Sequence, residues 1–249
     1  MASNTKYQVT GDDLRKVEAL GFSVSGEQTT FLEFLGQHLP GLRLADFVEA
    51  IDNFLAPLTQ SKLTKELHFF DQHPPMLMLQ YETASETDKQ KYLGLSRAFI
   101  RYPAELVVDH DFIQLPEEHR GKGKGKAIIT ACLNYYLECG VSRVRIYTGL
   151  EHGGLVWAKL FFAATDKKEV EAILEDAQAS LTSGQYQAVQ KIYELYYKKD
   201  PNGRKFPMLL WSRLPGMGRI LQRNRWHGEL DLTDRKTLAN FNLFKDDAG

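Results

Sequence analysis

Glycine and lysine alternate from Gly121 to Lys126, near the middle of this 249-residue chain, and this composition is typical of a phosphate-binding turn. The stretch before it, Glu105–Ile113, is rich in β-branched and aromatic residues and predicts a strand. The stretch after it, Ala127–Glu138, has apolar residues at helical spacing and predicts a helix. A glycine-rich turn between a strand and a helix presents backbone N–H groups at the positive end of the helix dipole, where a phosphate or pyrophosphate binds. Glycine suits such a turn because a side chain would hold the ligand away from the backbone.

The spacing of the glycines excludes two common phosphate loops. A P-loop needs G-x-x-x-x-G-K-S/T, but Lys126 is followed by Ala127. A dinucleotide fingerprint needs G-x-G-x-x-G, but the glycines here read G-x-G-x-G. Two other interpretations stay open: a solvated or tethering loop, since turns of this composition are common, and a contact of the lysines with nucleic acid. The second is disfavoured because no aromatic residues are interleaved with the lysines and the formal net charge is −1.

The segment from Leu115 to Gly125, LPEEHRGKGKG, resembles the acyl-CoA pyrophosphate loop of the GNAT superfamily of N-acetyltransferases, Q/R-x-x-G-x-G/A. Arg120, Gly123 and Gly125 stand on the fixed positions of that pattern. The resemblance implies a cofactor, acetyl-CoA or another acyl-CoA, with the backbone N–H near Leu115 as the contact for the thioester or oxyanion. It also implies that one continuous stretch binds the pyrophosphate or 3′-phosphate: Arg120, Gly121, Lys122, Gly123, Lys124, Gly125 and Lys126.

A second resemblance lies in Leu150–Phe162, LEHGGLVWAKLFF, which is similar to the A-x-x-x-Y-x-x-x-G-F helix of GNAT sequences. Trp157 stands where many members have the tyrosine that protonates the departing CoA thiolate, and Phe161 stands at the glycine. Indole is not an acid near neutral pH, so this position does not supply the family's usual proton donor. Trp157 is instead expected to contact the cofactor as an apolar wall for the acyl chain or pantetheine.

An acyl transfer needs a base that accepts the proton of the attacking amine, and three residues are candidates. His110 lies on the strand before the loop and has the intrinsic pKa of a base near neutral pH, although a lone strand histidine is commonly structural. Glu151 and His152 lie at a strand-to-helix turn, where the resemblance implies the acyl end of the cofactor. Tyr147 is a candidate for the replacement acid. No metal site is predicted, because the sequence has no H-E-x-x-H, C-x-x-C or EF-hand pattern.

The strand, the loop, the helix and a further strand expected at Ser142–Thr148 form a βαβ unit with a right-handed crossover. The expected fold class is α/β (α+β). The resemblance implies a GNAT-like mixed, splayed central sheet with helices on both faces and extra helical segments at both ends. The expected organisation is an N-terminal helical region packed on the core (1–75), a GNAT-like acyl-CoA-binding core (76–165) and a C-terminal helical extension (166–249).

The composition is that of an ordinary globular protein, with 31 Lys and Arg against 32 Asp and Glu, so no net field recruits nucleic acid or an anionic membrane. Cys132 and Cys139 lie seven residues apart on the expected helix, too far apart for a disulfide, which favours a reducing compartment. The chain shows no run with the length of a membrane span and no signal-peptide pattern. A cytoplasmic location is expected, with delivery by a specialised secretion system left open.

The sequence therefore predicts an N-acyltransferase of GNAT type, which transfers an acetyl or other acyl group from acyl-CoA to an amine. The amine acceptor, a protein or a small molecule, is left open. Two alternatives remain: a catalytically inactive GNAT-fold binding protein that holds a protein partner through its helical flanks, and a toxin or secreted effector built on this fold.

Overall fold

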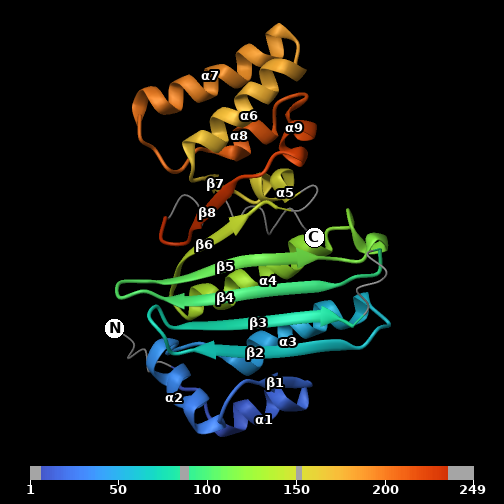
Figure 1. Ribbon diagram of the computed structural model, residues 1–249, viewed down its shortest axis with the longest axis vertical. Coiled ribbons are helices and arrows are strands. Elements are labelled where there is room, and N and C mark those ends of the chain that lie inside the picture. Colours follow the sequence, from blue (N-terminus) through green and yellow to red (C-terminus); the bar gives the residue numbers. More distant parts are fainter. Residues whose placement is uncertain (1–6, 85–89, 150–152, 235–249) are drawn as a thin grey trace. The chain divides into compact units, whose positions relative to one another are not determined.

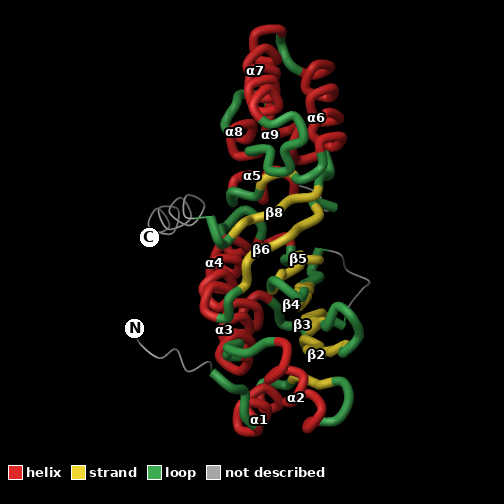
Figure 2. Tube along the Cα trace, turned by 90° about the vertical axis from the view of Figure 1, so that its left-hand side faces the viewer, coloured by secondary structure: helices red, strands yellow, loops and turns green. Residues whose placement is uncertain are grey.

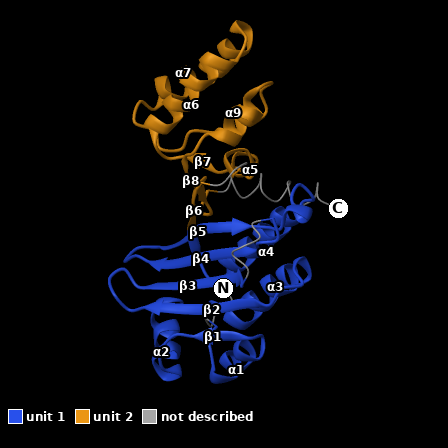
Figure 3. Ribbon diagram, turned by 45° about the vertical axis from the view of Figure 1, so that its right-hand side comes forward, with its two compact units in different colours: residues 1–142 blue, residues 143–249 orange. Residues whose placement is uncertain are grey.

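The computed structural model describes residues 7–84, 90–149 and 153–234. The chain divides into two compact units, residues 1–142 and 143–249, which Figure 3 shows in different colours. Each unit contains both helices and strands, and most neighbouring strands are antiparallel, so the expectation of a mixed fold with helices and a sheet is confirmed.

The first unit contains a five-stranded sheet with the strand order β1-β2-β3-β4-β5 (Figure 1). Its strand β1 runs parallel to β2, and the other neighbouring pairs are antiparallel. In chain order the elements are α1 (Gly11–Ala19), β1 (Phe22–Val24), α2 (Gln28–His38), α3 (Leu44–Leu55), a 3₁₀ turn (Ala56–Leu58), β2 (Leu63–Phe70), β3 (Met76–Thr83), β4 (Gly94–Arg101), β5 (Leu106–Gln114), a second 3₁₀ turn (Glu117–His119) and α4 (Lys124–Glu138).

One face of this sheet is covered by α3 and α4, which lie side by side along it (Figure 2). Alternate residues of β3, among them Leu77, Leu79 and Tyr81, are buried, and the Tyr81 hydroxyl donates to the Val48 carbonyl of α3 at 3.0 Å. Most of the residues between them are half-buried, as in an antiparallel sheet that packs on the core with one face. Helices are expected on both faces of the sheet, but α3 and α4 share one face.

The second unit contains most of β6 (Val141–Tyr147), and β8 pairs antiparallel with both β6 and β7, which gives the order β6-β8-β7. Its core includes the fully buried side chains of Trp211 and Trp226. The Phe206 ring lies 4.5 Å from the Trp211 ring, measured between centroids. The other elements are α5 (Gly153–Lys159), β7 (Ala163–Ala164), α6 (Lys167–Ser180), α7 (Ser183–Lys199), α8 (Met208–Ser212), α9 (Met217–Arg223) and β8 (His227–Asp231).

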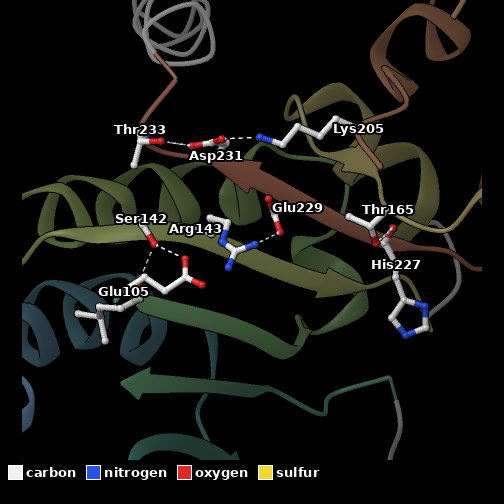
Figure 4. A network of polar contacts seen from close by, with 10 residues as sticks. Glu105, Ser142, Arg143, Thr165, Lys205, His227, Glu229, Asp231 and Thr233 are labelled. Atoms are coloured by element: carbon white, nitrogen blue, oxygen red, sulfur yellow. Dashed lines mark hydrogen bonds and ion pairs between the residues drawn. The ribbon is translucent and has the colours of Figure 1, made fainter. Parts of the chain in front are cut away.

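The strand, loop, helix and second strand predicted around the glycines are all present, as β5, the loop, α4 and β6. The Ser142 hydroxyl donates to Glu105 Oε2 at 3.0 Å and to the Leu106 carbonyl at 3.1 Å, so β5 and β6 begin side by side (Figure 4). This is the arrangement that a βαβ connection produces at the starts of its two strands.

The structure divides the chain differently from the three expected segments, 1–75, 76–165 and 166–249. The first of these contains the strands β1 and β2 besides its helices, and the last contains β8. Each of these strands pairs with a strand outside its own expected segment: β2 pairs with β3, and β8 pairs with β6. No helix in the described ranges is long and apolar enough to cross a membrane.

Candidate functional site

The glycine loop begins where β5 ends and is closed by an arginine. Leu115 is 8% exposed, and its carbonyl accepts a hydrogen bond from Arg120 Nε at 2.8 Å. The 3₁₀ turn Glu117–His119 lies between these two residues. The loop thus returns on itself before α4 begins, which fixes the start of α4 close to the end of β5.

Two of the three loop glycines have backbone conformations that favour glycine. Gly121 has a φ of 71° and Gly123, the N-cap residue of α4, has a φ of 74°, both in the left-handed region. Gly125 differs, because it lies in the first turn of α4 without a positive φ, and a Cβ there would meet no atom within 4 Å. A glycine inside a helix costs about 1 kcal/mol relative to alanine. The described chain gives no steric or conformational reason for Gly125, whereas a ligand close to the backbone would supply one.

The N-terminus of α4 has the electrostatics of an anion site. Among the residues that the structure describes, no side chain caps the helix, and its first turn has no acidic residue, so its N-terminal backbone N–H groups are available to a ligand. Lys122 and Lys124 are exposed beside this end of the helix, and Lys126 is half-buried in its first turn. The helix dipole and the lysine charges therefore act together to favour a phosphate group.

His110, a predicted base, lies in the interior of the first unit. It is 2% exposed, and its Nε2 atom lies 2.9 Å from the Tyr136 hydroxyl of α4. Burial, together with the nearby Arg97 charge, holds the pKa of His110 well below its usual value. The imidazole is therefore neutral near pH 7 and is screened from solvent, which is the environment of a structural histidine.

Arg97, on β4, is fully buried in the same place and was not recognised in the sequence as a residue of interest. Ser96 pairs with Phe112 and Ala98 with Asp109, so β5 has one extra residue opposite Arg97 and forms a β-bulge. Arg97 Nη1 donates to the Phe112 carbonyl at 2.8 Å and to the Ser96 carbonyl at 2.6 Å. The guanidinium thus holds the bulge, only three residues before Leu115 and the loop.

The buried Arg97 charge is incompletely satisfied. Its Nε and Nη2 atoms find no hydrogen-bond partner in the ranges that the structure describes. Burial raises the pKa of the neighbouring Cys132 thiol, and the Arg97 charge opposes that rise without reversing it. An arginine between apolar residues in the segment YLGLSRAFIR was the one sequence signal for this site.

The remaining predicted residues lie elsewhere. Trp157, in α5, is 6% exposed, and its ring meets the Phe162 ring edge-on at a centroid distance of 5.0 Å, so it is a core residue of the second unit. Glu151 and His152 lie outside the described residues. Within the first unit the structure therefore brings together Arg120 to Lys126 as a loop, and His110 lies in the buried interior of that unit.

Phe161 has a left-handed backbone conformation, which is favourable for glycine and strained for other residues. Its φ is 68°, just after α5, and the Phe162 N–H donates to the Trp157 carbonyl at 3.2 Å, as at many helix ends that finish in a left-handed residue. A non-glycine residue in this region costs about 1–2 kcal/mol.

A histidine and a carboxylate of the second unit form a pair that the sequence spacing did not reveal. Glu169 Oε1 lies 2.7 Å from His227 Nδ1, and Glu169 Oε2 accepts from the His227 backbone N–H at 2.7 Å. The Tyr147 ring, 47% exposed, lies 4.6 Å from the His227 ring. Within the described residues His227 Nε2 has no partner, so the pair has the chemistry of an oriented proton acceptor.

Beyond His227, alternate residues of β8 carry an ion-pair network on one face (Figure 4). Glu229 pairs with Arg143 at 3.1 Å, and Lys205 pairs with Asp231 at 2.5 Å. Burial alone would raise the pKa of Asp231, but hydrogen bonds from Lys205 and Thr233 outweigh it and lower the pKa to about 2. Among the described residues, no three His, Cys, Asp or Glu side chains are grouped so that they could hold a metal ion.

The Asp231 pKa predicts a pH dependence of stability. A carboxyl whose folded pKa is lowered stabilises the fold above its unfolded pKa, 3.8, and this stabilisation is lost as the pH falls towards 2. Between pH 4 and pH 2 we expect the free energy of unfolding to fall by about 1 kcal/mol more in the wild type than in Asp231→Asn. The difference is small because solvent screens the half-exposed Lys205. Urea unfolding at several pH values measures this difference, and parallel pH profiles of variant and wild type would show that the pair contributes nothing.

The chain matches no family model, and no curated protein is significantly similar to it.

Proposed function

We propose that the chain is an acyl-CoA-dependent N-acyltransferase of GNAT type, which transfers an acyl group to an amine. The observation that carries the proposal is the strand, loop and helix unit of the first unit, with its uncapped α4 N-terminus and its lysines. Gly125 supports the proposal, because a Cβ there would meet no atom within 4 Å and the backbone of the first turn of α4 is open to a ligand. The cofactor implied is acetyl-CoA or another acyl-CoA.

In this proposal each part of the loop has a separate task. The backbone N–H groups at Gly123 and the first turn of α4 bind the pyrophosphate, and Lys122 and Lys124 neutralise phosphate charge. Arg120 orders the loop by its bond to the Leu115 carbonyl, rather than by contact with the ligand. The backbone N–H near Leu115 is the proposed donor to the thioester oxygen, where charge develops during acyl transfer.

The catalytically inactive acyl-CoA-binding protein remains the second candidate, and the placement of two residues favours it. Trp157 cannot supply the acid that the family's pattern has at its position, and His110 is buried with a pKa well below its usual value, which makes it a weak base screened from solvent. A chain that binds acyl-CoA without consuming it would serve as a binding module, and its helices would be the surface offered to a protein partner.

One experiment separates the two candidates. Acetyl-CoA is incubated with the full chain and a panel of small amines and lysine-containing peptides, and the free CoA thiol is measured over time. The transferase proposal expects amine-dependent release of CoA. Saturable binding of CoA without release in any amine would favour the binding module, and absence of CoA binding would contradict both.

A further inference from the structure

The second unit contains a pocket of about 260 Å³ that the acyl-CoA loop does not explain. Its apolar wall is formed by Phe161, Phe162, Ala163, Pro207 and Leu209. Its volume equals that of about nine water molecules in the liquid, so it has room for a small organic molecule. A pocket of this kind, apolar with a few polar groups, is the usual form of a small-molecule site.

The charged groups that line the pocket are mostly acidic. They are Lys205 and three carboxylates, Glu229, Asp231 and Asp234. Lys205 pairs with Asp231, whose other oxygen accepts from Thr233, so this carboxylate is already satisfied. Among the described residues that line the pocket, Lys205 is the one cation beside three carboxylates, so a ligand that donates hydrogen bonds suits this lining better than an anion does.

Glu229 is the carboxylate best suited to hold that cation. Its side chain is only 11% exposed, and Arg143 Nη1 donates to its Oε2 atom at 3.1 Å (Figure 4). Its Oε1 atom accepts no hydrogen bond from any residue that the structure describes. Glu229 lines the pocket, and Oε1 is therefore the oxygen of this carboxylate that can accept a hydrogen bond from a ligand N–H.

Phe161 and Phe162 give the pocket an aromatic wall. The Phe161 ring is held there by a left-handed backbone, at a position where glycine would be free of strain. Aromatic faces bind both alkyl chains and ammonium groups favourably. The other candidate cation, a metal ion, has no suitable group of three ligands among the described residues.

We propose that this pocket binds a small primary alkylammonium ion. The ammonium group donates to Glu229 Oε1, and the alkyl chain lies against Phe161 and Phe162. The proposal rests on residues of the second unit alone, so it is independent of the acyl-CoA loop and can fail or succeed without it.

The test uses n-butylamine as the probe, titrated into the full chain at pH 7 by calorimetry, with n-butanol and butyrate as neutral and anionic analogues. An alkylamine is protonated at this pH, as a lysine side chain is. We expect saturable binding of n-butylamine and at least tenfold weaker binding of the two analogues. Equal binding of n-butanol, or no binding of n-butylamine, would overturn the proposal.

Matched variants locate the binding. Glu229→Gln should weaken n-butylamine binding at least tenfold, whereas Arg143→Gln breaks the same ion pair but keeps the carboxylate, and should leave the affinity equal or higher. Phe161→Gly should weaken binding while the Tm stays equal or rises, because the strain at Phe161 is relieved. Leu195→Ala, at an exposed residue of α7 outside the pocket, serves as the unaffected control. Wild-type affinity in Glu229→Gln would contradict the assignment of the site.

Discussion

Gly125→Glu is expected to weaken CoA binding strongly while it leaves the fold intact or makes it more stable. Gly125 is the second residue of α4, and a Cβ there meets no atom within 4 Å. Glutamate is a better helix former than glycine, and a negative charge in the first turn interacts favourably with the dipole. We expect the free energy of unfolding to rise by about 1 kcal/mol and CoA affinity to fall about 100-fold, because like charges placed together cost several kcal/mol. Urea unfolding and calorimetric titration of CoA measure the two effects.

The matched control for this variant is Gly184→Glu. Gly184 is likewise the second residue of a helix, α7, and a Cβ there also meets no atom within 4 Å. It should gain similar helix stability and keep the wild-type CoA affinity. If Gly125→Glu binds CoA as the wild type does, the N-terminus of α4 is not the phosphate site, whatever happens to stability.

Arg97→Ala is expected to lower the free energy of unfolding by about 3–5 kcal/mol, the largest stability effect that we expect from a single polar residue of the first unit. The substitution removes a fully buried side chain and leaves the Phe112 and Ser96 carbonyls without their donor. It also leaves the β5 bulge without the bond that holds it. Urea unfolding followed by far-UV circular dichroism measures the change.

Two further variants decide why Arg97 matters. Arg97→Met fills most of the space without a buried charge, and we expect it to cost far less than Arg97→Ala, since replacing a buried charge by an apolar side chain is often tolerated. Its CoA affinity should still fall, because the bulge leads directly into Leu115 and the loop. Arg15→Ala, at an arginine that is 75% exposed in α1, should change stability by less than about 0.5 kcal/mol. Equal stability of Arg97→Ala and Arg15→Ala would show that the buried guanidinium does not hold this region.

The strand, loop and helix around the glycines could be predicted because their signals are local. β-branched residues, alternating glycines and an apolar helical stripe follow one another within about thirty residues, and each element requires only its own sequence. The predicted strand Glu105–Ile113 is β5 (Leu106–Gln114), and the helix predicted at Ala127–Glu138 is α4, which begins three residues earlier, at Lys124. The difference arises because Gly123, rather than Lys126, is the N-cap residue, with a left-handed backbone.

The other features could not be predicted because they depend on residues far apart in the chain. β8 reads HGELD, which has little strand propensity, and it forms because β6 and β7 pair with it on both sides. Glu169 and His227 meet across 58 residues, and Arg97 matters only because a bulge in β5 lies opposite it. The burial of His110 likewise depends on Tyr136 of α4, which no pattern within the strand indicates.

The central claim is that the loop between β5 and α4 binds the pyrophosphate of an acyl-CoA. The most direct measurement compares CoA with pantetheine, which lacks the pyrophosphate and the nucleotide, by calorimetric titration into the full chain. The account predicts saturable binding of CoA at one site per chain and no measurable binding of pantetheine. A flat CoA titration, or equal binding of the two compounds, would contradict it.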